Sequence, residues 1–122
     1  MFEKMVEMGL LFDFYGKLLS DTQYTVVEHY YIHDLSLSEI ASNLSISRQG
    51  VHDALKRAEK KLYSYEEKLK LVEKFEATKE KTRDILKYID EIDKKAKQFN
   101  SYKMDENIKD IKKMVKDIIE TS

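Results

Sequence analysis

The segment 36–62 constrains the fold of this chain more than any other part of the sequence. Ser36 precedes an apolar run and Glu39 follows three residues later, a spacing that predicts a capping box at the start of a short helix. Apolar residues then recur at the spacing of one helical face, and Ser47 is suited to cap a second helix. Two short helices this close together predict a helix-turn-helix, whose second helix commonly enters a DNA major groove.

The turn between these helices departs from the usual pattern at one position. Ser45 stands where glycine is preferred, because a positive φ costs glycine least, so we expect strain or another turn there. Ile46 is expected to plug the core. The second helix is predicted to run from about Arg48 to Leu62. Its predicted buried stripe is Val51, Leu55, Ala58 and Leu62.

The opposite face of this second helix carries the residues predicted to contact nucleic acid. These are Arg48, Gln49, His52, Lys56, Arg57, Lys60 and Lys61. The first three are expected to approach base edges, since Arg and Gln near a helix start read guanine and adenine, and the others to hold phosphates. Asp53 on this face and the net charge of -1 favour the alternative, a unit that makes only protein contacts.

The composition predicts an all-α protein, because the chain has no proline, three glycines and 37% charged residues. The absence of cysteine excludes disulfides and cysteine-metal sites. No apolar run is long enough to span a membrane and the start lacks a signal-peptide pattern, so a cytoplasmic location is expected. No phosphate loop, nucleophile elbow or metal-ligand cluster is present. We therefore expect no enzyme, no cofactor and no metal, although His29 and His33 share a helical face.

Two more helices are expected before the motif. The first spans about residues 2–19, and the second follows Ser20, with Gln23 as its capping partner, and ends near residues 33–34. With the two helices of the motif they give a four-helix helix-turn-helix domain over residues 1–63, without a wing.

Residues 64–122 are predicted to form a long helical extension. Apolar residues follow a heptad seam at Thr82, Ile85, Ile89, Ile92, Ala96 and Phe99, and again at Met104, Ile108, Ile111, Val115 and Ile118. A turn is expected at residues 100–101, and the pattern leaves open whether residues 64–99 form one helix or two. The seams fit an antiparallel hairpin or contact with a second copy. A homodimer is expected, because exposed apolar stripes favour association and paired recognition helices read two-fold DNA sites.

Residues 19–62 resemble region 4 of bacterial sigma-70-type factors. The shared signs are the pair Tyr30-Tyr31, the triplet Glu39-Ile40-Ala41 and the turn exit Ile46-Ser47. The chain departs from that pattern at Ser45, which replaces the usual glycine, and at Gln23-Tyr24, where sigma factors commonly have arginine and glutamate. The second departure puts some phosphate contacts of that family in doubt.

A closer resemblance is to the YlxM family of small bacterial helix-turn-helix proteins. It covers about residues 5–76 and includes the segments EHYYIHDLSLSEIA, ISRQGVHDALKRAEKKL and YEEKLKLVEKF. That family is encoded beside the signal recognition particle GTPase, so the resemblance implies a role in that pathway. The leading hypothesis is a regulatory protein that binds double-stranded DNA and is linked to this pathway. The alternative is an accessory factor that binds the particle's GTPase or RNA without specific DNA binding.

Overall fold

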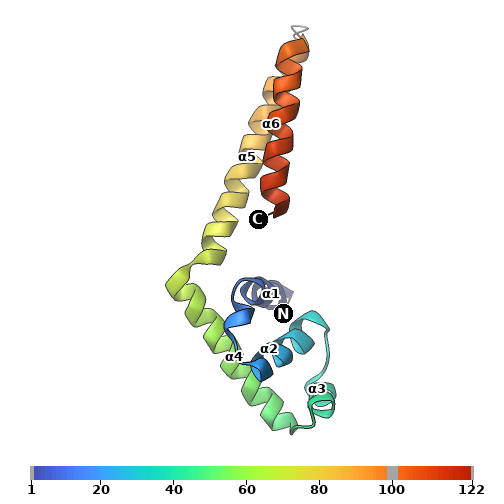
Figure 1. Cartoon of the computed structure of the whole chain (residues 1–122), viewed down its shortest axis with the longest axis vertical. Helices are drawn as coiled ribbons and strands as arrows, with labels where there is room; N and C mark the ends of the chain where they lie inside the picture. Colours follow the sequence, from blue (N-terminus) through green and yellow to red (C-terminus); the bar gives the residue numbers. More distant parts are fainter. Residues whose placement is uncertain (1, 99–101, 122) are drawn as a thin grey trace. The chain divides into compact units, whose positions relative to one another are not determined.

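A computed structural model of the chain describes residues 2–98 and 102–121, and every element in these ranges is helical (Figure 1). The all-α prediction is therefore confirmed. The chain divides into two compact units, Met1–Val72 and Glu73–Ser122. The predicted boundary after residue 63 falls inside α4 (Arg48–Leu69), because this helix continues past the residue where the prediction ended it. Among the described residues, no helix has the length and apolar character needed to cross a membrane.

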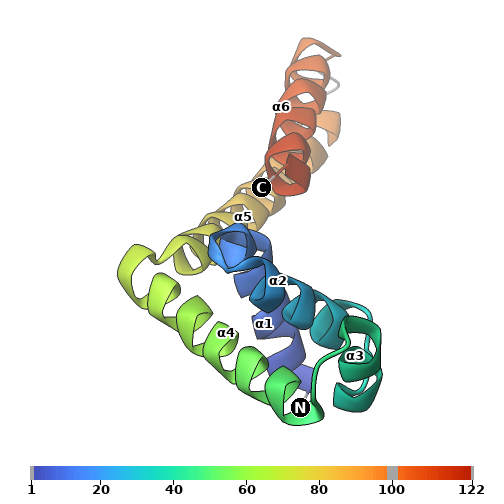
Figure 2. The same cartoon turned by 60° about the horizontal axis from the view of Figure 1, so that its bottom comes forward.

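The first unit surrounds α4 with three shorter helices. Its elements before α4 are α1 (Phe2–Tyr15), a 3-10 turn (Gly16–Leu18), α2 (Asp21–Val27), a π-helical stretch (Glu28–Ile32) and α3 (Leu37–Leu44). In Figure 2, α4 runs along α1 and α2, and α3 packs near its start. The predicted capping box of α2 is present, since the Gln23 backbone N–H donates to Ser20 Oγ at 3.3 Å.

Core packing confirms the predicted stripe of α4 and corrects two expectations nearby. Val51, Leu55, Ala58 and Leu62 are all buried against apolar residues of α1, α2 and α3. Ile46 was expected in the core but is 39% exposed, because it precedes the cap of α4 and lies beside Gly50. The first helix ends at Tyr15, earlier than predicted, and the 3-10 turn that follows leaves the Leu18 side chain exposed.

The residues after Leu62 belong to two helices, which answers the question that the sequence left open. Lys70 adopts a left-handed conformation (φ 54°) between α4 and α5 (Leu71–Gln98). The Tyr15 hydroxyl donates to Glu66 Oε1 at 2.6 Å and accepts from the Leu71 backbone N–H at 3.0 Å. Glu66 Oε1 also accepts from the Val72 N–H at 3.0 Å. These side chains satisfy N–H groups that lack partners at a helix start.

The second unit is an antiparallel hairpin of α5 and α6 (Tyr102–Thr121). Its apolar core consists of Ile89, Ala96, Ile108 and Val115. The intramolecular hairpin, one of the two predicted arrangements, is therefore present, but it covers only part of the seam. The isoleucines at positions 85, 92, 111 and 118 are 44% to 50% exposed. The predicted seam residue Phe99, the predicted turn at 100–101 and the side chain of Met104 lie outside the described residues.

Candidate nucleic-acid interface

The two helices of the motif are set by side-chain caps and a tight turn. The Glu39 N–H donates to Ser36 Oγ at 3.1 Å, while the Ser36 N–H donates to Glu39 Oε1 at 3.2 Å, which confirms the predicted capping box of α3. Ser47 caps α4 by accepting from the Gly50 N–H at 2.9 Å. Both helix starts are thereby fixed, and with them the angle at which α4 leaves the turn.

The turn itself carries the strain expected from its sequence. Ser45 has φ 55° and ψ 41°, in the left-handed region where a side chain costs roughly 1–2 kcal/mol. The Ile46 N–H donates to the Ala41 carbonyl at 3.1 Å, so the end of α3 is closed by backbone hydrogen bonds despite the missing glycine. The turn is thus that of a helix-turn-helix, made with serine.

The residues predicted to contact nucleic acid all lie on α4, but they do not form a single narrow face. The exposed ones are Arg48, Gln49, Lys56, Arg57, Lys60 and Lys61, and His52 is half-buried. Lys61 lies toward α2, since its Nζ donates to Gln23 Oε1 at 3.1 Å. Lys56 lies on the side of α1, since it approaches Glu59, which also neighbours Lys4. The structure therefore spreads the predicted contacts across the full exposed width of α4.

Asp53 organises the first turns of this surface. Its Oδ1 accepts from Gln49 Nε2 at 2.9 Å and lies 3.7 Å from His52 Nδ1. Two of the three side chains predicted to approach bases are therefore engaged by one exposed carboxylate. A base edge that takes up the Gln49 amide must displace this contact.

Glu59 was counted as an acidic residue of the exposed face, and the structure places it in the core. Its side chain is only 9% exposed, with Lys56 Nζ at 3.5 Å and Lys4 Nζ at 3.7 Å. The Tyr31 hydroxyl donates a short hydrogen bond to Glu59 Oε1. Burial, followed by this bond to the carboxylate, raises the pKa of Tyr31. Glu59 lies four residues after Leu55, at the edge of the buried stripe, and this spacing was the available signal.

A shallow surface hollow of about 490 Å³ lies where α4 passes α2. It is lined by Gln23, Arg57, Lys60, Lys61 and Ser64. Three cations, an amide and a hydroxyl match what a phosphate group takes from a protein surface. Gln23 and Ser64 were not among the predicted contacts. A sequence pattern does not bring them together, because residues on different helices meet only in the folded unit.

The histidines do not add to this surface. His29 and His33 have ring centroids 6.0 Å apart, as their spacing on one helical turn predicts. In the described part of the chain, no three histidine, aspartate or glutamate side chains gather as they would around a metal ion.

The arrangement of α3, the turn at Ser45 and α4 defines a helix-turn-helix protein. The model of the UPF0122 family, described as "Putative helix-turn-helix protein, YlxM / p13 like", matches residues 2–111, and the chain belongs to this family. The predicted resemblance to the YlxM family is confirmed.

Similar relatives carry the same family name. The UPF0122 protein of Caldanaerobacter subterraneus subsp. tengcongensis is 56% identical over 78 residues, which cover 64% of this chain and 67% of the relative. The UPF0122 protein of Acetivibrio thermocellus is 40% identical over 119 residues, 98% of this chain and 99% of the relative. That of Listeria innocua is 39% identical over 118 residues, 97% of this chain and 99% of the relative. These matches extend over both units.

Proposed function

We propose that this chain is a DNA-binding regulatory protein of the cytoplasm that presents the first turns of α4 to a major groove. The observation that carries the proposal is the exposed start of α4, which follows the turn directly and bears Arg48 and Gln49. Side chains at this place of a helix-turn-helix reach base edges. Arg57, Lys60 and Lys61, around the hollow beside α2, hold phosphates and fix the orientation of the helix.

The regulator works as a homodimer on a two-fold site and belongs to the signal recognition particle pathway. Support for the pathway comes from the family, whose members are encoded beside the GTPase of that particle. Support for the dimer comes from the logic of the motif, in which two recognition helices about one DNA turn apart read related half-sites.

The experiment that tests DNA binding is a selection from a randomised duplex pool at near-physiological salt with the full chain. Recovery of a short two-fold motif is the expected result. Affinities are then compared for Arg48→Ala, Lys60→Ala and the control Lys94→Ala, whose exposed lysine lies on α5. Arg48→Ala should relax sequence preference, Lys60→Ala should weaken all duplexes alike and lower the salt slope by about one, and the control should change neither. Uniform losses for Arg48→Ala contradict base reading.

A second candidate, an accessory factor that binds the particle's GTPase or RNA, is favoured by the hydrogen bond that engages Gln49 with Asp53. The nearly balanced charge of the chain points the same way. A selection that recovers no duplex, together with co-purification of the GTPase that survives high salt, supports this candidate. Contacts to phosphates weaken steeply with salt, whereas apolar contacts between proteins do not.

A further inference from the structure

The hairpin of α5 and α6 leaves half of its apolar seam uncovered. Positions 82, 89 and 96 of α5 and positions 108 and 115 of α6 are buried. Each exposed isoleucine lies three residues after one of these buried positions. The exposed ones are Ile85, Ile92, Ile111 and Ile118. The hairpin thus uses one of the two alternating positions of the seam for its own core and leaves the other free to contact a further apolar surface.

The exposed isoleucines of both helices lie on the same side of the hairpin. They are rotated from their buried neighbours in the same sense, and in an antiparallel pair equal rotations lead to the same face. The register follows from Lys112, whose Nζ lies 2.7 Å from Asp90 Oδ1 and 3.0 Å from Asp93 Oδ2. Counting outward from this bridge at equal rise places Ile111 level with Ile92 and Ile118 level with Ile85.

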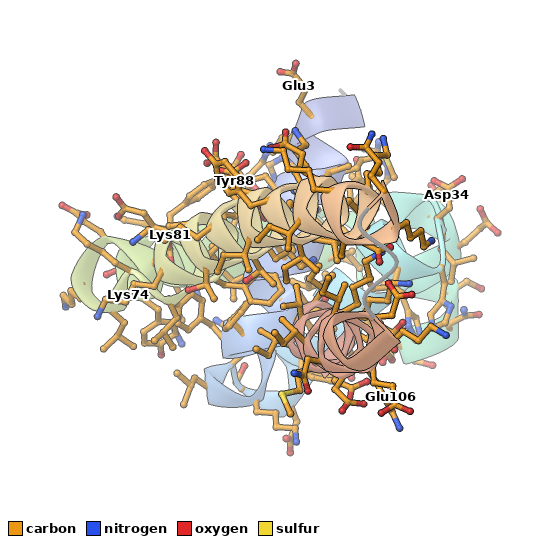
Figure 3. All side chains as sticks on the ribbon, turned by 90° about the horizontal axis from the view of Figure 1, so that it is seen from above. Glu3, Asp34, Lys74, Lys81, Tyr88 and Glu106 are labelled. Atoms are coloured by element: carbon orange, nitrogen blue, oxygen red, sulfur yellow. The ribbon has the colours of Figure 1, made fainter. Side chains whose placement is uncertain are left out.

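Two further apolar residues complete this surface. Tyr88 (65% exposed) and Met114 (63% exposed) lie between the two isoleucine layers. Figure 3, which looks along the hairpin, shows Tyr88 on the same side of α5 as Lys81, while Glu106 projects from α6 away from α5. We call the surface of residues 85, 88, 92, 111, 114 and 118 the hairpin face.

We propose that the hairpin face binds the hairpin face of a second copy, with α5 of each copy against α6 of the other. The seam pattern gives the four helices what an antiparallel four-helix bundle needs, two alternating apolar positions on each helix. The face extends over roughly 25 Å along residues 82–98 and about two helix widths, so the pair would bury roughly 1,000 Å² in total, the size at which specific interfaces begin.

Charge selects this pairing over the one with α5 against α5. Lys81 and Lys95, both exposed, flank Tyr88 at intervals of seven. In an antiparallel pair of α5 helices centred on the hairpin face, Lys81 of each copy would oppose Lys95 of the other, and such like-charge pairs are unfavourable. With α5 against α6, Lys95 instead reaches the level of the exposed Asp110 of the second copy. The α5 helices then enter the bundle from the same end.

This pairing deepens the proposed function, since it names the interface of the homodimer, and its last consequence rests on that proposal. Because both α5 helices start at one end of the bundle, both helix-turn-helix units are attached at that end. A single two-fold DNA site can then engage both α4 helices.

Sedimentation velocity of the full chain tests the interface. A dimer at micromolar concentration is expected, and Ile92→Glu should raise the dimer dissociation constant by about 100-fold or more, because the change buries charge twice per dimer. Lys94→Glu, on an exposed position away from the face, is the matched control and should leave the dimer intact. Circular dichroism should show equal helix content for all three proteins. A monomeric wild-type chain, or an unaffected Ile92→Glu dimer, overturns the proposal.

Disulfide trapping tests the orientation, and the chain suits it because it has no cysteine of its own. The variants Ile85→Cys, Ile92→Cys and Ile111→Cys are prepared separately and mixed in pairs, one of each pair carrying a size tag. Mixing the 92 and 111 variants should give a covalent heterodimer, since these positions meet across the proposed interface. A heterodimer from the 85 and 92 variants instead means α5 against α5 and overturns the orientation.

Failure of this interface is distinguishable from failure of DNA binding. A trapped dimer that selects no duplex keeps the interface and removes the DNA-binding proposal. A chain that selects a single half-site and sediments as a monomer does the reverse.

Discussion

Replacing Tyr31 by phenylalanine tests whether the buried carboxylate of Glu59 stabilises the helix-turn-helix unit. The variant keeps a buried ring and removes only the hydroxyl that donates to Glu59 Oε1. The nearest cations, the Nζ atoms of Lys56 and Lys4, lie at 3.5 and 3.7 Å. Hydrogen bonds to charged groups contribute about 1.5–3 kcal/mol, so the free energy of unfolding should fall by about 2 kcal/mol.

Tyr63→Phe is the matched control, because it also deletes one tyrosine hydroxyl from the same unit. That hydroxyl donates to Glu7 Oε2 at 3.2 Å in an exposed position, so its loss should cost less than about 1 kcal/mol. Urea unfolding followed by circular dichroism measures both. With an m value of about 1.5 kcal/mol/M, the Tyr31→Phe midpoint should fall by roughly 1.3 M, at least twice the shift of the control. Equal shifts for the two variants would refute the role of the buried carboxylate.

Alkaline pH separates the hydroxyl's hydrogen bond from simple packing at Tyr31. Burial and the bond to Glu59 raise the pKa of Tyr31 above its usual value of 10.0. A raised pKa means that the stabilisation is fully present below about pH 10 and is lost as the pH rises toward the higher pKa of the folded state. The wild-type unit should therefore lose stability above pH 10 more steeply than Tyr31→Phe. Parallel pH profiles would contradict this cause.

Three other perturbations address different parts of the chain. Gly16→Ala should lower the free energy of unfolding by about 1–3 kcal/mol in a thermal melt, because the added Cβ would lie 2.9 Å from the buried ring of Phe12. Asp53→Asn should tighten duplex binding in a fluorescence titration, since it removes an anion from the start of α4 and weakens its hold on the neighbouring amide; weaker binding would show that the carboxylate itself recognises a base. The hydrogen bond from Lys112 holds the pKa of Asp93 below its usual 3.8, so the hairpin's stabilisation from this pair is present above about pH 4 and lost as the pH falls. Asp93→Asn should flatten melting temperatures between pH 5 and 3, and an unchanged slope would argue against the pair.

Local signals in the sequence predicted the motif well because the physics behind them is local. The capping boxes at Ser20 and Ser36 need only the residue three positions on, and both are present in the structure. The buried stripe of α4 needs only the helical repeat. The left-handed turn at Ser45 follows from a position where two helices must change direction within a few residues.

What the sequence did not predict depends on contacts between distant residues. The break at Lys70 has no glycine or proline to mark it, and the start of α5 is capped by Tyr15, more than fifty positions away. The burial of Glu59 likewise depends on Tyr31, which approaches it from a different helix. A charged residue at the edge of a stripe reads as solvated until its partner is known.

The heptad seam shows where periodicity alone stops being informative. A repeat of three and four predicts that alternating positions are apolar, but it does not say how many helices share them. In the hairpin, Ile89 and Ile108 meet within one chain, while Ile92 and Ile111 face outward. A two-helix hairpin needs only one of the two alternating positions, whereas a four-helix bundle needs both. The second position is therefore better explained by a partner of the same kind, and the trapping of residue 92 against residue 111 of another copy decides whether that partner is the chain itself.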